Sequence, residues 1–513
     1  MRVLLAMLER GFDRIFGAAN NPLHHLGALA FLFFWIVLAS GIYLYLFFET
    51  STAGAFRSVE YLTHEQWYAG GVMRSLHRYA SDAMVVAALL HLVREFVLDR
   101  FRGFRWFSWV TGVPLLWLIF ISGVNGYWLV WDRLAQYVAV AASEWLDWLG
   151  IFGQPIARNF LDQAVVSDRF FTLLVFLHIG VPLFLLAFSW LHVSRISRPR
   201  TLPPRALVIG ATFMLLTLAL WKPALSQGPA DLDTVPAAVA LDWFLLGGLP
   251  LLDAWGPGAL WALAGGLTLL LILLPWLAPR RRPPVAVVDP PNCNGCGLCF
   301  ADCPYAAVTM QPHPLRSGHR VAIVDPDLCA SCGICAGACP SSTPFRSASE
   351  LVTGIDMPQL SIHALREKLR DALAREQGEG AVVVFGCDHA VDVRALAQPG
   401  VAAFSLLCTA QLPPSFVDYA LRHGADGVLV TGCKAADCHY RLGNTWVEQR
   451  LAGARQPHLR THAARARVRI AWAGPADGAA LRRALADYRA ALRASASEAA
   501  PGSARTRGGA AHG

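Results

Sequence analysis

Charged residues are scarce in this chain of 513 residues. They make up 16% of the sequence, whereas an ordinary soluble protein has about 25%, and hydrophobic residues make up 55%. This shortage excludes a disordered or fibrous protein and argues against a wholly soluble one. Acidic residues are fewer than basic ones, 36 against 44, so the net charge is +8. In so apolar a chain, this excess indicates basic loops at membrane edges rather than a nucleic-acid partner.

Cysteine is absent before Cys293, and all twelve cysteines lie from there on. A secreted protein held by disulfides would be shorter and would spread its cysteines along the chain, so that class is excluded. Cysteines clustered behind an apolar region predict instead a metal-binding part in a reducing compartment. The chain is therefore predicted to have several domains, with a membrane part over residues 1–282 and a soluble part after it.

Long runs that contain almost no charge fill the membrane part. We predict six membrane helices, since a bilayer core of about 30 Å needs about 20 apolar residues. The runs cover residues 25–48, 77–98, 108–131, 170–193, 204–221 and 257–278. The segment before them, MRVLLAMLERGFDRIFG, has the pattern of an amphipathic basic helix rather than of a cleavable signal peptide.

Arginines gather on alternate sides of these runs. They precede the first run, lie between the second and third and between the fourth and fifth, and follow the sixth. The clusters are Arg2, Arg10 and Arg14; Arg94, Arg100, Arg102 and Arg105; Arg195, Arg198, Arg200 and Arg205; and Arg280, Arg281 and Arg282. Because basic loops stay inside, this predicts six spans in a bacterial inner membrane, with both termini and the cysteine-rich part in the cytoplasm.

Four histidines lie inside the predicted membrane helices. His77 and His91 share the second run, His178 and His192 share the fourth, and the spacing within both pairs is the same. This spacing is nearly four helical turns, so both histidines of a helix face the same way, about 21 Å apart. Two such helices side by side offer a histidine pair near each membrane face, which suits two bis-histidine haems. The alternative is that the histidines only form hydrogen bonds inside the bundle.

Two pairs of glycines repeat the same spacing. They are Gly27 and Gly41 on the first predicted helix, and Gly112 and Gly126 on the third. Without a side chain they let a flat macrocycle approach the backbone, although glycine is also common in membrane helices. Arg74 and Arg94 flank the histidines of the second helix, and we predict that they neutralise haem propionates.

Residues 20–200 resemble the N-terminal four-helix half of cytochrome b from quinol–cytochrome c reductases. The resemblance is carried by Arg-Ser-Leu-His-Arg around His77, by the histidine and glycine pairs, and by Gly-Tyr-Trp-Leu-Val-Trp-Asp from Gly126. It implies an α-helical membrane bundle with a four-helix, two-haem-b core in residues 1–200 and two further helices in 201–282. It also implies the ligand pairs, His77 with His178 for the outer haem and His91 with His192 for the inner one.

Cytochrome b relatives keep quinone sites beside their haems, so the resemblance implies quinone as a substrate. The family's outer signature, Pro-Glu-Trp-Tyr, has as its counterpart Asp242-Trp243-Phe244, which lacks the proline and has a shorter acid and Phe for Tyr. We therefore predict a quinone site beside the inner haem, where His24, His25 and Arg195 could supply a proton and a counter-charge. The alternative is that these three only anchor helix ends in the headgroups. A homodimer through this region is left open.

Eight cysteines in residues 283–350 follow one doubled pattern, C-x2-C-x2-C-x3-C-P, which ends at Pro304 and again at Pro340. Gly295, Gly297 and Gly333 give backbone amides room to approach the sulfurs. The pattern resembles the bacterial two-cluster ferredoxin, which implies an α+β domain with two [4Fe-4S] clusters and a fourth cysteine that crosses between runs. The implied ligands are Cys293, Cys296, Cys299 and Cys339 for cluster one, and Cys329, Cys332, Cys335 and Cys303 for cluster two. Structural zinc is the alternative.

Residues 351–493 alternate between apolar and helical stretches. The predicted strands are 381–386, 401–407, 427–432 and 467–473, and the predicted helices are 361–377, 413–423 and 476–493. This is typical of an α/β domain with a mostly parallel sheet. Cys387, Cys408 and Cys433 end the first three strands, with Cys438 just beyond, and such strand ends bind ligands. Four thiolates there suit a [2Fe-2S] cluster; zinc and unligated core cysteines are the alternatives.

This segment resembles the delta subunit of methyl-viologen-reducing hydrogenase. The match lies in Gly-Ala-Asp-Gly-Val-Leu-Val from Gly424, Gly-Cys-Lys-Ala-Ala-Asp-Cys-His-Tyr from Gly432, and Gly443-Asn444. Where the family has a second cysteine after the first, this chain has Asp388-His389-Ala390. The resemblance implies a cytoplasmic partner, a flavoprotein or a hydrogenase- or heterodisulfide-reductase-like complex. Residues 494–513 are mainly Ala, Gly, Ser and Arg and are predicted to be disordered.

Together these parts predict a membrane-bound electron-transfer protein that links the quinone pool to a cytoplasmic redox partner. The sequence shows no Walker loop, hydride site or flavin fingerprint, so no catalytic residue is assigned and the partner would supply the substrate chemistry. Two alternatives are kept. One is a quinol-oxidising subunit of a larger complex that drives electrons to a low-potential acceptor, and the other is a membrane redox sensor.

Overall fold

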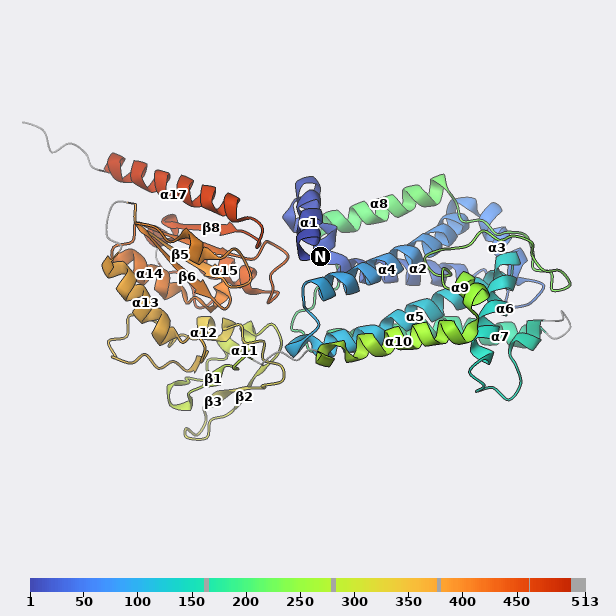
Figure 1. The fold of residues 1–513 in the computed structure, drawn as a ribbon, viewed down its shortest axis with the longest axis horizontal. Coiled ribbons are helices and arrows are strands. Elements are labelled where there is room, and N and C mark those ends of the chain that lie inside the picture. Colours follow the sequence, from blue (N-terminus) through green and yellow to red (C-terminus); the bar gives the residue numbers. More distant parts are fainter. Residues whose placement is uncertain (161–165, 278–282, 376–379, 461, 500–513) are drawn as a thin grey trace, which may run out of the picture. The chain divides into compact units, whose positions relative to one another are not determined.

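The computed structural model describes the chain except for residues 161–165, 278–282, 376–379, 461 and 500–513. It divides into two compact units, Met1–Arg281 and Arg282–Gly513, whose elements are labelled in Figure 1. Arg280, Arg281 and Arg282, the cluster predicted to follow the sixth membrane run, lie outside the described residues.

Helices build the first unit, and each predicted apolar run coincides with one of them. These are α2 (Leu26–Tyr45), α4 (Val72–Val97), α5 (Trp106–Val130), α7 (Asp168–Val193), α8 (Arg205–Trp221) and α10 (Pro257–Leu277). A helix satisfies its own backbone polar groups, which a lipid environment requires. The N-terminal segment forms the predicted amphipathic helix, α1 (Arg2–Phe16). The sequence prediction did not include α3 (Ala55–His64), α6 (Arg133–Asp147) or α9 (Leu249–Trp255).

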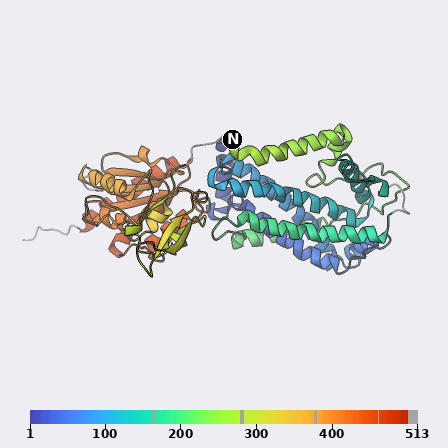
Figure 2. The same ribbon diagram turned by 90° about the horizontal axis from the view of Figure 1, so that it is seen from below.

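Among the described residues, four helical stretches are long and apolar enough to cross a membrane. They are 22–45, 103–130, 168–193 and 257–277. Helix α8 is shorter, at 17 residues, and α4 is less apolar because it carries Arg78, Asp82 and two histidines. Helix α4 nevertheless packs lengthwise against α2, and α5 against α7; Figure 2 shows these long helices side by side. These two packed pairs position the four histidines.

Short antiparallel strands and helices form the first part of the second unit. Strand β1 (Val287–Val288) pairs with β4 (Ile355–Asp356), and β2 (Val308–Pro312) pairs with β3 (Arg320–Val324). Helices α11 (Leu298–Asp302) and α12 (Ile334–Ala338) each follow a glycine with φ of 75°, Gly297 and Gly333. Glycine is favoured at such a positive φ. The two halves share this turn because they share the same cysteine pattern.

A parallel sheet with the strand order β6–β5–β7–β8 forms the other part of this unit. The strands are β5 (Val382–Cys387), β6 (Val401–Leu406), β7 (Gly427–Gly432) and β8 (Val468–Trp472), which confirms the predicted parallel sheet. Strands β5 and β7 are buried throughout, as expected for apolar strands covered on both faces. Helix α17 (Gly478–Ala499) packs on one face through Leu481 and Leu485. Helices α14 (Pro414–Arg422) and α15 (Gly443–Ala452) lie on the other (Figure 1).

The C-terminal helix is longer than the sequence suggested. Disorder was predicted from Ala494, but α17 continues to Ala499. Alanine and arginine have high helix propensity, so the alanine-rich composition that suggested disorder also extends the helix. Residues 500–513 of the predicted tail lie outside the described residues. Helix α13 (Ile362–Arg375) agrees with its predicted range.

Candidate metal centres

His77 and His178 lie together between the helix pairs. Their ring centroids are 6.2 Å apart and their planes meet at 62°. Two metal–imidazole bonds of about 2 Å on opposite sides of one ion bring the ring centroids about 6 Å apart, so this spacing fits a shared iron. His77 Nδ1 is 3.0 Å from the carbonyl oxygen of Val37. Because a carbonyl only accepts, Nδ1 carries the hydrogen and Nε2 keeps a free lone pair for a metal.

His91 and His192 form the second pair, further along the same two helices, α4 and α7. The two rings lie close enough to interact electrostatically. His192 Nδ1 is 3.2 Å from Thr111 Oγ1, and that hydroxyl donates its own hydrogen to the carbonyl oxygen of Phe107 at 2.7 Å. The hydroxyl oxygen therefore accepts from Nδ1, and Nε2 of His192 is left free. The structure thus brings together the two pairs that the resemblance to cytochrome b implied.

Each predicted glycine lies against one of these histidines. A Cβ atom added at Gly126 would lie 2.8 Å from Cε1 of His178, closer than real Cβ atoms approach. At the other three glycines, an added Cβ atom would also lie close to the nearest ring atom of a histidine. The pairs are Gly41 with His77 (3.0 Å), Gly112 with His192 (3.2 Å) and Gly27 with His91 (3.4 Å). That these glycines also admit a macrocycle stays a prediction, and the protein atoms nearest to each of them belong to an imidazole ring. The glycines let neighbouring helices approach until the rings fit between them.

Arg74 and Arg94, predicted to neutralise haem propionates, already have carboxylate partners. Arg74 Nη1 is 3.5 Å from Glu60 Oε1, and its Nη2 donates to Ser226 Oγ at 2.7 Å. Arg94 Nη2 is 2.9 Å from Glu9 Oε1, and the side chain is buried. A propionate would have to join or displace these partners, so the role of both arginines stays a prediction.

A buried polar cluster lies beside the His77–His178 pair. Tyr127 donates to Asp242 Oδ2 at 2.6 Å, and Arg78 Nη2 lies 3.1 Å from the same oxygen. Arg78 also pairs with Asp82, and its guanidinium lies 5.4 Å from the Tyr127 ring centroid. Two carboxylates share one guanidinium here, and the Asp242 side chain is only 1% exposed. We call Arg78, Asp82, Tyr127 and Asp242 the Asp242 cluster.

The sequence prediction used Asp242 only as a weak counterpart of a family signature and missed its three partners. The signal was available for two of them. Arg78 and Asp82 are charged residues on a predicted membrane helix, and such residues are functional candidates by default. Tyr127 stands in one of the motifs that carry the resemblance to cytochrome b, but its contact with Asp242 joins residues 115 apart in the chain, and no local pattern predicts that contact.

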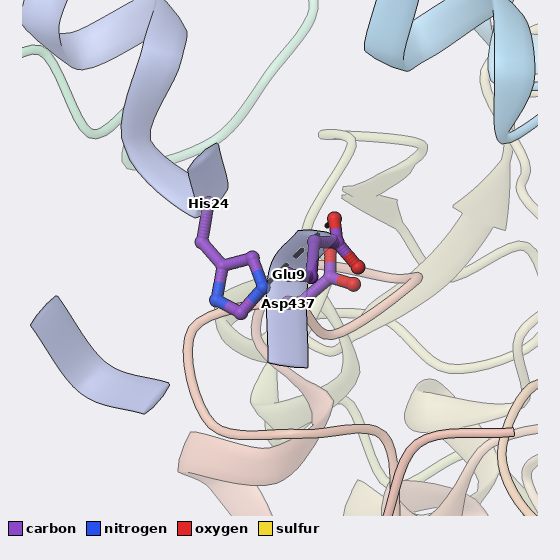
Figure 3. Close-up of side chains that lie close together, drawn as sticks. All are labelled: Glu9, His24 and Asp437. Atoms are coloured by element: carbon purple, nitrogen blue, oxygen red, sulfur yellow. Dashed lines mark ion pairs between the residues drawn. The ribbon is translucent and has the colours of Figure 1, made fainter. Parts of the chain in front are cut away.

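His24 and His25 are anchored at the start of α2. His24 Nδ1 and His25 Nε2 each lie within 3.2 Å of a backbone carbonyl oxygen of η1 (Ala18–Asn20). Figure 3 shows the His24 ring pointing toward Glu9, with Nε2 4.0 Å from Oε1. Arg195 lies over aromatic rings at the start of α5. These contacts agree with helix-end anchoring, the alternative that the sequence left open.

In the described part of the second unit, two small cavities are each lined by four cysteines. The first is lined by Cys293, Cys296, Cys299 and Cys339, and the second by Cys303, Cys329, Cys332 and Cys335. Each cavity therefore combines three cysteines of one run with the fourth of the other. This crossing arises because α11 and α12 pack against each other.

Burial keeps the thiols of these cavities protonated unless a metal centre takes the place of the protons. Burial and then the neighbouring cysteines raise the pKa of Cys299 to about 12. Burial also raises the pKa of Cys335 well above its usual range. Thiolates so close together repel one another unless a metal centre neutralises them. Four sulfur donors around one small cavity fit an iron–sulfur cubane.

The last four cysteines meet at the carboxyl end of the parallel sheet. The thiols of Cys387 and Cys438 each hydrogen-bond with those of Cys408 and Cys433, so the four sulfur atoms form a ring. The bonds from Cys408 and Cys433 lower the pKa of Cys438 well below its usual range. We call this ring the four-cysteine centre. Its donor set fits a [2Fe-2S] cluster and zinc alike.

Helix α15 starts directly against the four-cysteine centre. A Cβ atom added at Gly443 would lie 2.6 Å from Cys408 Sγ and 3.2 Å from Cys438 Sγ. The backbone N–H of Asn444 hydrogen-bonds to Cys438, and its side chain donates to the carbonyl oxygen of Cys433 at 2.5 Å. The partial positive charge of this helix end therefore faces the sulfurs. Sequence reasoning noted Gly443-Asn444 only as part of a resemblance and missed the helix.

Three family models match the chain in succession. Cytochrome b/b6/petB matches residues 15–199, the 4Fe-4S dicluster domain matches 292–343, and methyl-viologen-reducing hydrogenase, delta subunit, matches 377–494. The chain is a fusion of these three regions. This confirms the three predicted resemblances and their order. The cytochrome b region implies haem b, and the dicluster region implies iron–sulfur clusters.

Among solved structures, the fusion is similar to a chain described as "Hyperthermophilic respiratory Complex III". The two are 21% identical, with a TM-score of 0.41, over 50% of this chain and 75% of that chain. The apolar helices and the three matched regions make the fusion a membrane electron-transfer protein.

Proposed function

We propose that the fusion carries electrons between the quinone pool and a cytoplasmic redox partner. The route comprises two b haems, two [4Fe-4S] clusters and a [2Fe-2S] cluster in the four-cysteine centre. The observation that carries this proposal is the repeated histidine pair. His77 and His192 each have an Nδ1 engaged by a backbone or hydroxyl oxygen and a free Nε2. The shared spacing of nearly four helical turns places one pair near each membrane face.

The residues of the first unit hold the haems rather than react. Haem iron supplies one-electron chemistry when it is bound. His77 with His178 and His91 with His192 would each hold one haem, and a haem held by two imidazoles would transfer electrons rather than bind a further ligand. The Val37 carbonyl and the Thr111 hydroxyl fix the orientation of His77 and His192, and outer partners of this kind tune the metal.

We place the quinone site beside the inner haem. Gly27, which lies against the His91 ring, is two residues from His25. The start of α2 is therefore next to the inner histidine pair. Quinone reduction takes up protons as well as electrons, and an imidazole can deliver protons near neutral pH. His24 and His25 are the proposed proton donors, and Arg195 the proposed counter-charge.

A second candidate is quinol oxidation beside the outer haem, and the Asp242 cluster favours it. Arg78 follows His77 directly, and Tyr127 follows Gly126, which lies against His178. A quinol releases two protons when it is oxidised. Two carboxylates that share one guanidinium, with a tyrosine hydroxyl beside them, could accept those protons.

Inhibitors distinguish the two quinone sites. With a quinol analogue as donor, inhibitors of the inner site of cytochrome b relatives are expected to shift the inner haem spectrum and to stop reduction of the clusters. His25→Gln is expected to slow cluster reduction on the order of 100-fold, because oxidation of the quinol releases protons and the variant removes an imidazole that accepts one. Asp242→Asn is the matched variant at the outer site and should have little effect. Slowing by Asp242→Asn alone, with inhibition only by outer-site compounds, would favour the second candidate.

The arginine distribution supports six spans with both termini and the iron–sulfur regions in the cytoplasm of a bacterium. Alkaline phosphatase fused after residue 285 is expected to be inactive, because that enzyme works only outside the cytoplasm. A fusion after Asp233, in the loop between α8 and α9, is the control and should be active. The reverse pattern would overturn both the topology and the cytoplasmic partner.

We propose as partner a flavoprotein or a hydrogenase- or heterodisulfide-reductase-like complex. The support is the match of residues 377–494 to the delta subunit of methyl-viologen-reducing hydrogenase. In the described residues the four-cysteine centre is the metal site of that region, so we expect it to face the partner. A homodimer through the cytochrome b region remains part of the proposal for the first unit.

A further inference from the structure

The dicluster region and the delta-subunit region touch at the backbone beside their metal sites. The short helix η8 (Thr409–Gln411) follows Cys408 of the four-cysteine centre directly. A Cβ atom added at Gly337 of α12 would overlap the carbonyl oxygen of Ala410. Gly333, which lines the second ferredoxin cavity, meets the same short helix, because a Cβ atom added there would lie 2.8 Å from the Gln411 side chain. The second ferredoxin cavity and the four-cysteine centre are therefore neighbours, separated by a distance on the order of 10 Å.

A buried ion pair holds this contact. Arg450 Nη2 lies 2.5 Å from Asp302 Oδ2, and both side chains are at most 2% exposed. Arg450 Nη1 also donates to the carbonyl oxygen of Ala410 at 2.8 Å. Arg455 Nε donates to the second carboxylate oxygen of Asp302 at 2.8 Å, and Trp446 Nε1 donates to its backbone oxygen at 3.0 Å. A buried charge pair adds little net stability, but moving one member away leaves the other charge buried and unpaired. The pair therefore fixes the relative position of the two segments that carry it.

The loop after Cys438 reaches both metal sites. The Tyr440 hydroxyl is 3.0 Å from Nε2 of His389, which is two residues from Cys387 of the four-cysteine centre. The next residue, Arg441, donates from Nη1 to the carbonyl oxygen of Pro304 at 3.2 Å, and Pro304 lines the second ferredoxin cavity.

Residues of the dicluster region line both ferredoxin cavities. Gly333 lies against Gln411, and the carbonyl oxygen of Ile334 lies 3.5 Å from Arg450 Nη2; both residues line the second cavity and not the first. Cys296 of the first cavity is exposed to solvent. The first cavity is therefore the more accessible of the two, and the second is the one joined to the four-cysteine centre.

We propose that cluster two, and not cluster one, exchanges electrons directly with the four-cysteine centre, and that Asp302 and Arg450 are positioning residues that fix their spacing. The inference rests on the proposed function, since it needs a redox-active centre at each site. A single electron passes in each step, so one centre is oxidised by one unit and the other is reduced by one unit. No bond forms or breaks, and no co-reactant is needed. Cluster one is then the centre that exchanges electrons with donors or acceptors outside this unit.

Electron-spin spectra of the purified full-length chain test this order. In the unmodified chain, the signal of the four-cysteine centre is expected to broaden at the potential where cluster two becomes reduced. Cys335→Ala removes a cluster-two ligand and should abolish the broadening. Cys299→Ala removes a cluster-one ligand and is the matched control, which should keep it. Retained coupling in Cys335→Ala together with its loss in Cys299→Ala would overturn the proposal.

Asp302→Asn tests the positioning role. It should retain all iron but lose much of the coupling, whereas Glu350→Gln, an exposed acid of the same region, should change neither. Full coupling in Asp302→Asn, with all iron present, would exclude the positioning role. If the unmodified chain shows separate signals from both reduced [4Fe-4S] clusters and from the reduced four-cysteine centre, without coupling between them, this inference is refuted and the proposed function stands. Absence of any signal from the four-cysteine centre would instead refute the [2Fe-2S] cluster of the proposed function, and the inference with it.

Discussion

Replacement of His178 by alanine is expected to remove one of the two b haems and to leave the other in place. The centroid of the His178 ring lies 6.2 Å from that of His77, and a haem that these two imidazoles hold together would be lost when one of them is removed. The pyridine haemochrome assay should fall from about two haems per chain to about one. The double variant His77→Ala with His178→Ala should lose no more than the single one, whereas His91→Ala with His178→Ala should lose both haems.

The two double variants test which histidines hold the same haem, and not only how many haems the chain binds. If His178 shared its haem with His91, the two double variants would exchange their results. Gly126→Val offers an independent check, because its side chain would meet the His178 ring where even a Cβ atom lies 2.8 Å away. Gly180→Val, on the helix that carries His178, is the control, since nothing lies within 4 Å of a Cβ atom there. Only the first should disturb the outer haem.

The second large effect is expected at Cys339. Its removal should eliminate the cluster of Cys293, Cys296 and Cys299 rather than that of its own run, because Cys339 lines their cavity. Cys339→Ala should therefore lose about four iron atoms per chain. Adding Cys299→Ala should remove no further iron, whereas adding Cys335→Ala should remove about four more. Iron analysis with electron-spin spectra of each variant provides the measurement.

The opposite result would mean that each run binds its own cluster. In that case the double variant with Cys335→Ala would lose only one cluster, and the one with Cys299→Ala would lose two. Haem content and the presence of the signal of the four-cysteine centre, whatever its width, serve as folding controls, because the ligands of both lie outside the ferredoxin cavities. A variant that lost these as well would be unfolded and would be replaced by the corresponding serine substitution.

Local pattern identified most of the candidate metal ligands before any fold was known. The cysteine runs are short, and the haem histidines repeat within single helices, so their spacing alone indicates their chemistry. Helix α4 was predicted as a membrane run over residues 77–98, but its histidines, Arg78 and Asp82 make it less apolar than its neighbours, and it is not among the four stretches apolar enough to cross a membrane. The same polar residues are the functional candidates of this helix.

By itself, the sequence determined the three regions and their order, the candidate ligands, and the strands of the parallel sheet, because each depends on spacing within a short stretch. Tertiary structure alone decided that the glycines face imidazole rings, that Asp242 meets Tyr127 and Arg78, and that Asp302 pairs with Arg450. These contacts join segments that are far apart in the chain. No local periodicity encodes them, since they arise only when whole helices and strands pack against one another.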